Sequence, residues 1–341
     1  MHGSYLADLT WRLAAGAARL EEPCRQRHGR FLAGQQNSDG GFAGRQGPSD
    51  LYYTGFAVRA LALLGLLDSA QATGVVRFLL GYLGPGGDAR EPGAEAGGTG
   101  GDRAKVSALG RLPSVDFYSL VFTAVLLEAS LGWEVFQRAG LDRVAVVVER
   151  VGRLRRADGG LAKTERSPHS STYHTFLGAA CCQLTGAPLP ASDQLVQAIR
   201  SRQRPDGGFV ELEPLPRSGT NPTAAAIGLM RMLGASDQIA ADRAASFLAS
   251  MQTREGGFRA HEAIPVADLL STFTALTALV DLEATAAIDL KALMRYVESL
   301  ERAEGGFLGG LWDDQSDAEY TFYGLGSLAL AHGLDHQRAG H

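Results

Sequence analysis

The chain has 341 residues, of which 45% are hydrophobic and 20% charged, with a net charge of −5. This composition is typical of a globular protein, and the lack of a basic surplus argues against nucleic acid as a partner. The three cysteines, Cys24, Cys181 and Cys182, are odd in number and the last two are adjacent, so no disulfide framework is expected. Residues 1–8 do not read as a signal peptide, and no later apolar stretch is expected to reach the roughly 18 residues of a membrane span. We therefore expect a cytoplasmic protein.

One short motif recurs along the chain: an acidic residue, two glycines and an apolar residue, here called the Gly-Gly motif. Its copies are Asp39-Gly40-Gly41-Phe42, Asp158-Gly159-Gly160-Leu161, Asp206-Gly207-Gly208-Phe209, Glu255-Gly256-Gly257-Phe258 and Glu304-Gly305-Gly306-Phe307. The last four copies are 48, 49 and 49 residues apart, and a fixed period of this length is the signature of a repeat architecture. We expect the glycines to supply a positive φ or a close approach that turns the chain after a helix.

The first two copies are separated by 119 residues, which is two periods plus about twenty residues of excess. A degraded copy, Gly84-Pro85-Gly86-Gly87, falls between them. The sequence therefore predicts six repeats over about 20–333, within a single domain spanning 1–341. The Gly- and Pro-rich excess at 88–112 is predicted to be a mobile surface loop, with a lid over the mouth as the alternative.

Two helical patterns alternate within each period. One is amphipathic, as expected of a helix that faces water on one side, and occurs at 20–36, 69–83, 138–154, 190–203, 236–252 and 285–301. The other carries hardly any charge, as expected of a helix buried on all sides, and occurs at 52–67, 117–132, 172–185, 222–234, 269–282 and 318–332. Because strand patterns are lacking, the predicted fold is all-α: an α6/α6 toroid with an outer and an inner ring of helices around a central cavity.

The starts of the inner helices share good N-cap or first-turn residues, such as Asp50, Ser114, Ser171, Asp268 and Asp317. All six are therefore expected to begin at one rim, where their dipoles favour an anion. Aromatic and related residues follow just below, and the ones predicted to line the cavity are Tyr52, Tyr53, Tyr118, Tyr173, His174, Phe176, Phe273, Tyr320 and Tyr323. Such a cavity suits a ligand with an apolar tail and an anionic head. The alternative is a filled core.

Two inner-helix starts, the segments 50–56 (DLYYTGF) and 317–325 (DAEYTFYGL), together with the repeated Gly-Gly motif, resemble the β subunits of protein prenyltransferases. The resemblance is nearest to Rab geranylgeranyltransferase, in a superfamily that also holds squalene–hopene and other class II terpene cyclases. It implies a toroid that binds an isoprenyl diphosphate and transfers the prenyl group to a thiol. It further implies a helical-repeat α subunit as partner.

In the family that the chain resembles, an Asp-x-Cys and a His hold zinc. The matching positions here are Asp268, Leu270 and Tyr320, so two of the three ligands are missing and zinc stays only a possibility. Asp268 is more simply explained as an N-cap. The family's diphosphate site implies basic residues in the loops before the inner helices, and the candidates are Lys163, Arg166, Arg217, Arg259 and His261. The alternative for these five is solvated loop charge.

A second metal hypothesis comes from Asp313, Asp314 and Asp317, which match the Asp-Asp-x-x-Asp motif that binds magnesium and diphosphate in class I terpene synthases. Here the motif lies in a loop, so a chance match is the alternative. The Asp-x-Asp-Asp motif of class II cyclases is lacking, and those enzymes normally carry a second toroid. Three functions remain: a prenyltransferase-like protein, a non-catalytic binder of an isoprenoid or protein partner, and a terpene-cyclase relative.

Overall fold

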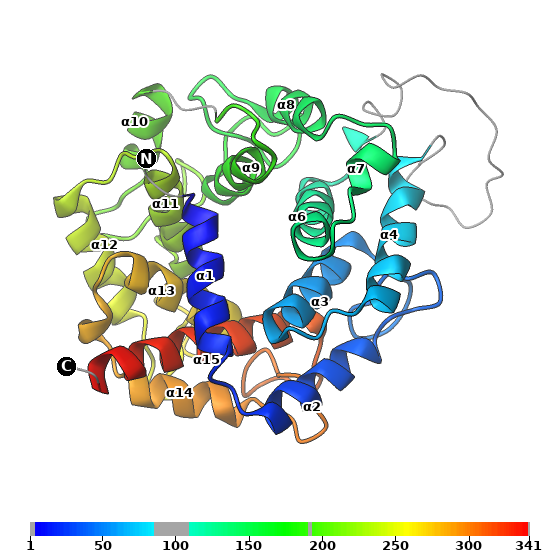
Figure 1. Ribbon diagram of the computed structural model, residues 1–341. Helices are drawn as coiled ribbons and strands as arrows, with labels where there is room; N and C mark the ends of the chain where they lie inside the picture. Colours follow the sequence, from blue (N-terminus) through cyan, green and yellow to red (C-terminus); the bar gives the residue numbers. More distant parts are fainter. Residues whose placement is uncertain (1–3, 85–108, 190–192, 340–341) are drawn as a thin grey trace.

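A closed ring of six helices forms the centre of the molecule (Figure 1). In this computed structural model, which describes residues 4–84, 109–189 and 193–339, each inner helix contacts the next and the last contacts the first. The inner helices are α3 (Leu51–Leu64), α6 (Ser114–Leu131), α9 (Thr172–Thr185), α11 (Thr220–Met232), α13 (Leu269–Asp281) and α15 (Ala318–Ala339).

Six amphipathic helices surround this ring (Figure 1). They are α2 (Glu22–Ala33), α4 (Ser69–Leu83), α8 (Arg143–Leu154), α10 (Asp193–Ser201), α12 (Gln238–Ser250) and α14 (Leu290–Ser299). Two short elements, α7 (Val135–Arg138) and the 3-10 helix η1 (Thr285–Ala287), precede α8 and α14. Within the described ranges there is no strand, only isolated bridges at the Gly-Gly motifs. The predicted α6/α6 toroid is confirmed, with inner-helix boundaries within three residues of those expected, except at the carboxyl end of α15.

The Gly-Gly motif makes the same turn in each copy. Its first glycine has a positive φ, for example 91° at Gly207, and its second glycine packs so closely that a Cβ on Gly208 would lie 2.6 Å from Ser218. The apolar residue then donates its backbone N–H to a threonine in the inner helix of the same repeat, as Phe209 does to Thr223 at 2.8 Å. The same bond joins Phe42 to Thr54, Leu161 to Thr175, Phe258 to Thr272 and Phe307 to Thr321. The predicted role of the glycines is therefore confirmed.

Hydrogen bonds between loops place the inner-helix starts at one rim. The N–H groups of Thr172, Thr220 and Leu269 donate to carbonyls in the loop of the following repeat. At the closure of the ring, Arg45 after the first Gly-Gly motif binds Asp317 before α15. The rim predicted from the sequence is thus confirmed.

Four of the expected N-caps are present, at Asp50, Ser171, Asp268 and Asp317. Pro222 is the third residue of α11 rather than the first, a place it tolerates because the first-turn N–H groups lack intrahelical partners.

The inner helix α6 corrects one expectation from the sequence. Its 18 residues are long and apolar enough to cross a membrane, by length and composition alone. However, α6 packs between α3 and α9 in the inner ring, and half of it is buried inside the molecule. The helix is therefore explained as part of the protein core.

Two further segments fall outside the predicted pattern. The insertion expected at 88–112 lies largely outside the described residues. The amino-terminal helix α1 (Tyr5–Ala17) was not expected, and it crosses one end of the inner ring, in contact with α15, α3, α9 and α11 (Figure 1).

Candidate functional site

The second residue of every inner helix keeps part of its surface accessible, although the helices themselves are buried. These residues are Tyr52, Val115, Tyr173, Asn221, Leu270 and Glu319. Tyr173 keeps 37% of its surface exposed, yet burial is the largest cause of its raised pKa. Arg59 and Glu319, on helices across the ring from α9, also act on that pKa. Together these facts indicate that Tyr173 faces an accessible space inside the ring rather than the outer surface.

Glu319 contributes a carboxyl group to the interior of the ring. Its Oε1 accepts a hydrogen bond from the Tyr52 hydroxyl at 2.6 Å, which joins α15 to α3 where the ring closes. Burial raises the pKa of Glu319 to about 7, against the opposing effects of the Tyr52 hydrogen bond and the Arg59 charge. The carboxyl is therefore divided between its protonated and ionised forms near neutral pH.

Arg59 contributes a positive charge to the interior of the ring. Its Nε donates to the carbonyl of Gly55 at 2.9 Å, and its guanidinium lies 4.3 Å from the ring centroid of Phe56 and 5.5 Å from that of Phe322. Burial lowers its pKa, but the group stays charged because arginine begins so high. Within the described residues its two Nη atoms have no hydrogen-bond partner, and they are not among the side-chain atoms sealed from solvent. A charged donor pair is thus available to a ligand.

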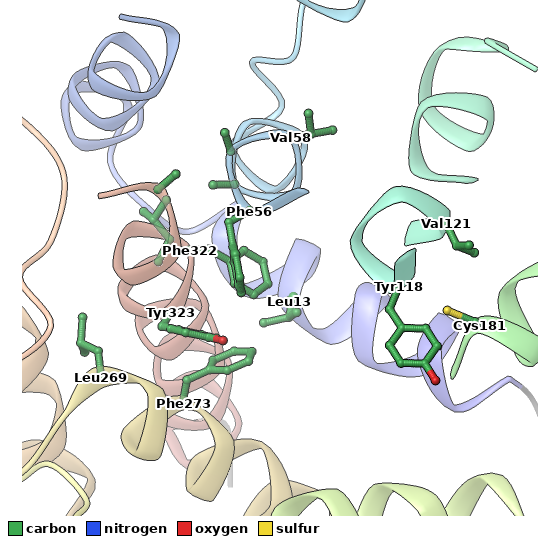
Figure 2. Close-up of a cluster of buried hydrophobic side chains, with 14 of the residues drawn as sticks. Leu13, Phe56, Val58, Tyr118, Val121, Cys181, Leu269, Phe273, Phe322 and Tyr323 are labelled. Carbon is green, nitrogen blue, oxygen red and sulfur yellow. The ribbon is translucent and has the colours of Figure 1, made fainter. Parts of the chain in front are cut away.

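Aromatic rings from three helices form the wall beside Arg59. Figure 2 shows Phe56, Phe273, Phe322 and Tyr323 pointing toward one another from α3, α13 and α15. The ring pairs Phe56–Tyr323, Phe273–Phe322 and Phe273–Tyr323 have centroids 5.2 to 5.6 Å apart. Such a wall favours an apolar chain, and the faces of its rings can stabilise a cation.

The nine residues predicted to line the cavity divide into groups. Tyr52, Tyr173, Phe273 and Tyr323 belong to the interior just described. Phe176 is half-buried, and its ring meets that of Tyr5 in α1 at 6.4 Å.

The other four lie elsewhere. Tyr118 is only 2% exposed and lies between α6 and α9 beside Cys181 (Figure 2). His174 is buried, with Nδ1 2.8 Å from the Ser171 hydroxyl. Tyr53 and Tyr320 pack over Gly44 and Gly309 in the rim loops. For these four, packing within the protein is the interpretation that the contacts favour.

The five basic residues proposed for a diphosphate lie in the loops that precede the inner helices. Lys163, Arg166 and Arg217 are exposed, whereas Arg259 and His261 are half-buried. Arg259 donates to the carbonyl of Glu262, and Nδ1 of His261 accepts from the N–H of Ala263, so both serve their own loop.

At the family's zinc position the side chains do not form a zinc-binding set. Asp268 lies near Tyr320 and caps α13: its Oδ1 accepts from the N–H of Ser271 at 2.7 Å and its Oδ2 from the Ser271 hydroxyl at 2.9 Å. Leu270 offers no donor atom, and burial raises the pKa of Tyr320 to about 12. A thiolate and an imidazole, which zinc prefers, are both lacking from these three residues.

The Asp-Asp-x-x-Asp motif is engaged by an arginine. Asp313 and Asp317 both pair with Arg45, the latter at 3.3 Å, while Asp314 points to solvent. Because the guanidinium occupies the place between the two carboxylates, the motif closes the rim, and its fit to magnesium is poor.

Cys24, His28 and Glu301 form a second cluster with metal-binding side chains. Nδ1 of His28 accepts from the N–H of Gly306 at 3.0 Å, so the proton of the neutral ring is on Nε2 and points to Glu301 at 2.9 Å. Burial lowers the pKa of His28 to about 4, which keeps the ring neutral. Since Nε2 has no free lone pair, the cluster serves to join α2 to the last Gly-Gly motif.

A family comparison identifies the fold. The profile of the prenyltransferase alpha-alpha toroid domain matches residues 9–188 and 187–340. The chain belongs to this family. In sequence, no curated protein matches it.

Solved structures share the toroid at low identity. Protein geranylgeranyltransferase-I of Candida albicans, complexed with GGPP, is 13% identical with a TM-score of 0.66, over 92% of each chain. A variant of the type II terpene cyclase MstE from Scytonema, complexed with geranylgeranyl dihydroxybenzoate, is 14% identical with a TM-score of 0.56, over 96% of this chain and 99% of that one. The α-1,6-mannanase GH76A of Salegentibacter is 9% identical with a TM-score of 0.58.

Two conclusions follow from these similarities. The cyclase is covered almost completely by one toroid, so a second toroid is not required of every type II cyclase. Because the same toroid also occurs in a mannanase, the chemistry of this prenyltransferase-toroid protein must be argued from its own side chains.

Sequence reasoning missed Arg59 and Glu319. Both stand within helical runs that otherwise have hardly any charge. A charge in a helix that is buried on all sides is the signal that could have identified them.

Proposed function

We propose that this chain binds an isoprenyl diphosphate, or an isoprenoid with a similar anionic head, inside the ring. The observation that carries the proposal is Arg59, whose Nη donors are without a partner in the described structure while aromatic rings surround its guanidinium. A guanidinium in such a low-dielectric place binds phosphate oxygens through paired hydrogen bonds. The apolar chain packs against Phe56, Phe273 and Phe322.

The hydroxyl groups of Tyr173 and Tyr323 add donors to this site. Neither hydroxyl has a hydrogen-bond partner among the described residues; Tyr173 keeps 37% of its surface exposed, and the Tyr323 hydroxyl is not among the atoms sealed from solvent. Together with Arg59 they supply the neutral and charged donors that an anion needs once it leaves water.

Isothermal titration calorimetry with farnesyl and geranylgeranyl diphosphate tests the proposal. We expect micromolar or tighter binding by the wild type and a loss of at least about tenfold in Arg59→Met, which removes the charge but keeps the length. The matched control is the double variant Arg259→Ala, His261→Ala in the rim loops, which is expected to bind like the wild type. If the rim variant loses binding and Arg59→Met keeps it, the diphosphate lies at the rim. Lack of binding by the wild type would refute the proposal.

Glu319 favours a second candidate function, acid-initiated rearrangement of the bound isoprenoid. Glu319 reaches the aromatic wall through Tyr52, whose ring centroid lies 4.9 Å from that of Phe56. A carboxyl with a pKa of about 7 at this place can give its proton to an alkene carbon, and the rings stabilise the resulting cation. The carboxylate of Glu319 then takes back a proton from a carbon next to the cationic carbon, so the acid is regenerated and the product is an isomer that keeps its diphosphate. This candidate uses Glu319 as the acid and does not use the Asp-Asp-x-x-Asp motif, in which Asp313 and Asp317 pair with Arg45.

One assay separates the candidate reactions. The chain is incubated with geranylgeranyl diphosphate, with and without a cysteine peptide, and both free diphosphate and isomeric products are measured. Thiol transfer releases one diphosphate per prenylated peptide. This reaction would also require a group that activates the thiol and, as in the family's β subunits, a partner α subunit. Rearrangement releases none and yields an isomer that disappears in Glu319→Gln. If neither product forms while binding persists, the chain is a non-catalytic isoprenoid binder.

A further inference from the structure

Helix α1 closes the ring at the end opposite the rim. Its backbone N–H at Leu6 donates to Gln183 near the carboxyl end of α9, at 3.1 Å. Tyr5 and Arg12 both bind the carboxylate of Asp281, the last residue of α13, at 3.0 and 2.6 Å. Since the inner helices begin at the rim, these contacts place α1 across their carboxyl ends.

The fit of α1 against α15 is close. Gly16 packs on the backbone of α15 so tightly that a Cβ there would lie 1.9 Å from the carbonyl oxygen of Ala329. A side chain at this position would push the helix out, so the glycine sets how deeply α1 enters the ring.

One face of α1 points into the ring and carries Tyr5, Leu9 and Leu13, spaced four residues apart. Leu13 is buried, and Figure 2 shows it beside the aromatic group of Phe56, Phe322, Tyr323 and Phe273. The opposite face carries Trp11, which is 76% exposed.

We infer that Leu13 and Leu9 of α1 form the floor of the isoprenoid site and set the length of apolar chain that it accepts. This inference rests on the proposed function. Leu13 lies beside the aromatic wall, on the helix that crosses this end of the ring, so an apolar chain that packs on the wall would end against α1. A smaller residue at the floor therefore admits a longer chain, and a larger residue admits only a shorter one.

The test compares the affinities of geranyl, farnesyl and geranylgeranyl diphosphate for the full-length chain and its variants. Leu13→Ala removes about three buried carbons, so the ratio of geranylgeranyl to farnesyl affinity is expected to rise about tenfold. Leu9→Trp fills space, and the same ratio is expected to fall. Trp11→Ala, on the outward face of the same helix, is the control and leaves the ratio unchanged.

The outcomes separate the two proposals. A variant that only loosens α1 lowers the affinity for all three ligands by the same factor. The affinity ratio therefore reports the effect of ligand chain length separately from any loss of protein stability. If the wild type binds but neither Leu13→Ala nor Leu9→Trp changes the ratio by more than about twofold, α1 is not the floor and the proposed function stands. If the wild type binds none of the three ligands, both proposals fall.

Discussion

The hydroxyl of Tyr52 lies 2.6 Å from Oε1 of Glu319 and joins the first and last inner helices of the toroid. The pair lies in the second position of each helix, where side chains face the interior. Arg59, Arg45 and Asp317 are the other charged groups that act on Glu319. The contact thus has two roles. It joins the helices where the ring closes, and it holds in place a carboxyl group whose protonation changes near neutral pH.

The first prediction concerns the stability of the chain against pH. Burial raises the pKa of Glu319 in the folded chain to about 7 from its ordinary value of 4.5, so the carboxyl loses its proton at lower pH in the unfolded chain than in the folded one. Ionisation of Glu319 therefore destabilises the folded chain. The loss of stability begins above about pH 4.5 and is complete above about pH 7, and it amounts to on the order of 2 kcal/mol after allowing for the partial exposure of the group. We expect Glu319→Gln to be more stable than the wild type at pH 8 and equal to it at pH 4.5. Urea unfolding at both pH values measures this, and an equal difference at both would contradict it.

The second prediction concerns Tyr52. Its hydrogen bond stabilises the ionised form of Glu319, so Tyr52→Phe is expected to raise the pKa of that carboxyl by about one unit. Carboxyl carbon NMR of the chain labelled at glutamate follows the titration, and Glu319→Gln assigns the signal. Tyr53→Phe, one residue on, is the matched control because its ring packs on Gly44 and the hydrogen bond to Glu319 comes from Tyr52 instead. A titration that is unchanged in Tyr52→Phe would show that the hydroxyl does not control the carboxyl.

The fold could be predicted from the sequence because its information is local and repeated. The positive φ of Gly207 and the crowding at Gly208 are requirements of a single turn, and they recur with the period of the chain. Helix α1 could not be predicted in the same way. It occurs once, outside the period, and its place depends on contacts with Gln183 and Asp281 that are far away in sequence.

The site was only partly predictable for a related reason. Tyr52, Tyr173, Phe273 and Tyr323 follow from their places near the helix starts, but Tyr118 has the same kind of place and turns toward α9 instead. Rotation of a helix about its axis decides this, and it depends on packing with neighbours. The rim arginines were singled out from the resemblance, whereas Arg59 was hidden within an apolar run.

The third prediction concerns metal. Asp268 lies near Tyr320 at the family's zinc position, but Leu270 and Tyr320 cannot supply the thiolate and imidazole. We expect the purified wild type to contain far less than one zinc per chain, and the double variant Leu270→Cys, Tyr320→His to bind about one with an affinity that falls in acid. Elemental analysis and competition with a chromogenic chelator measure both. Stoichiometric zinc in the wild type would mean that other residues bind it.

The fourth prediction compares two glycines with positive φ. A Cβ on Gly207 would lie 2.3 Å from the carbonyl oxygen of Arg243, whereas Gly234, with a φ of 63°, has nothing within 4 Å. Gly234→Ala therefore adds only backbone strain, about 1 kcal/mol, while Gly207→Ala adds strain and a clash with backbone, about 3 kcal/mol or more. Chemical unfolding of the two variants gives the comparison. Equal losses would show that the Gly-Gly turn tolerates displacement of α12.

The last prediction concerns the anchor of α1. Asp281 has a buried side chain that accepts from both Tyr5 and Arg12 and also pairs with Arg231 of α11 at 3.9 Å, so its replacement removes a partner from one hydroxyl and two guanidinium groups. Asp281→Ala is expected to cost about 3 kcal/mol and to release α1, and hydrogen exchange in residues 5–17 should rise while that of α4 stays slow. Asp8→Ala, an exposed acid in the first turn of the same helix, is the control. If exchange in α1 is as slow in Asp281→Ala as in the wild type, the close packing of Gly16 on α15 is sufficient to hold the helix.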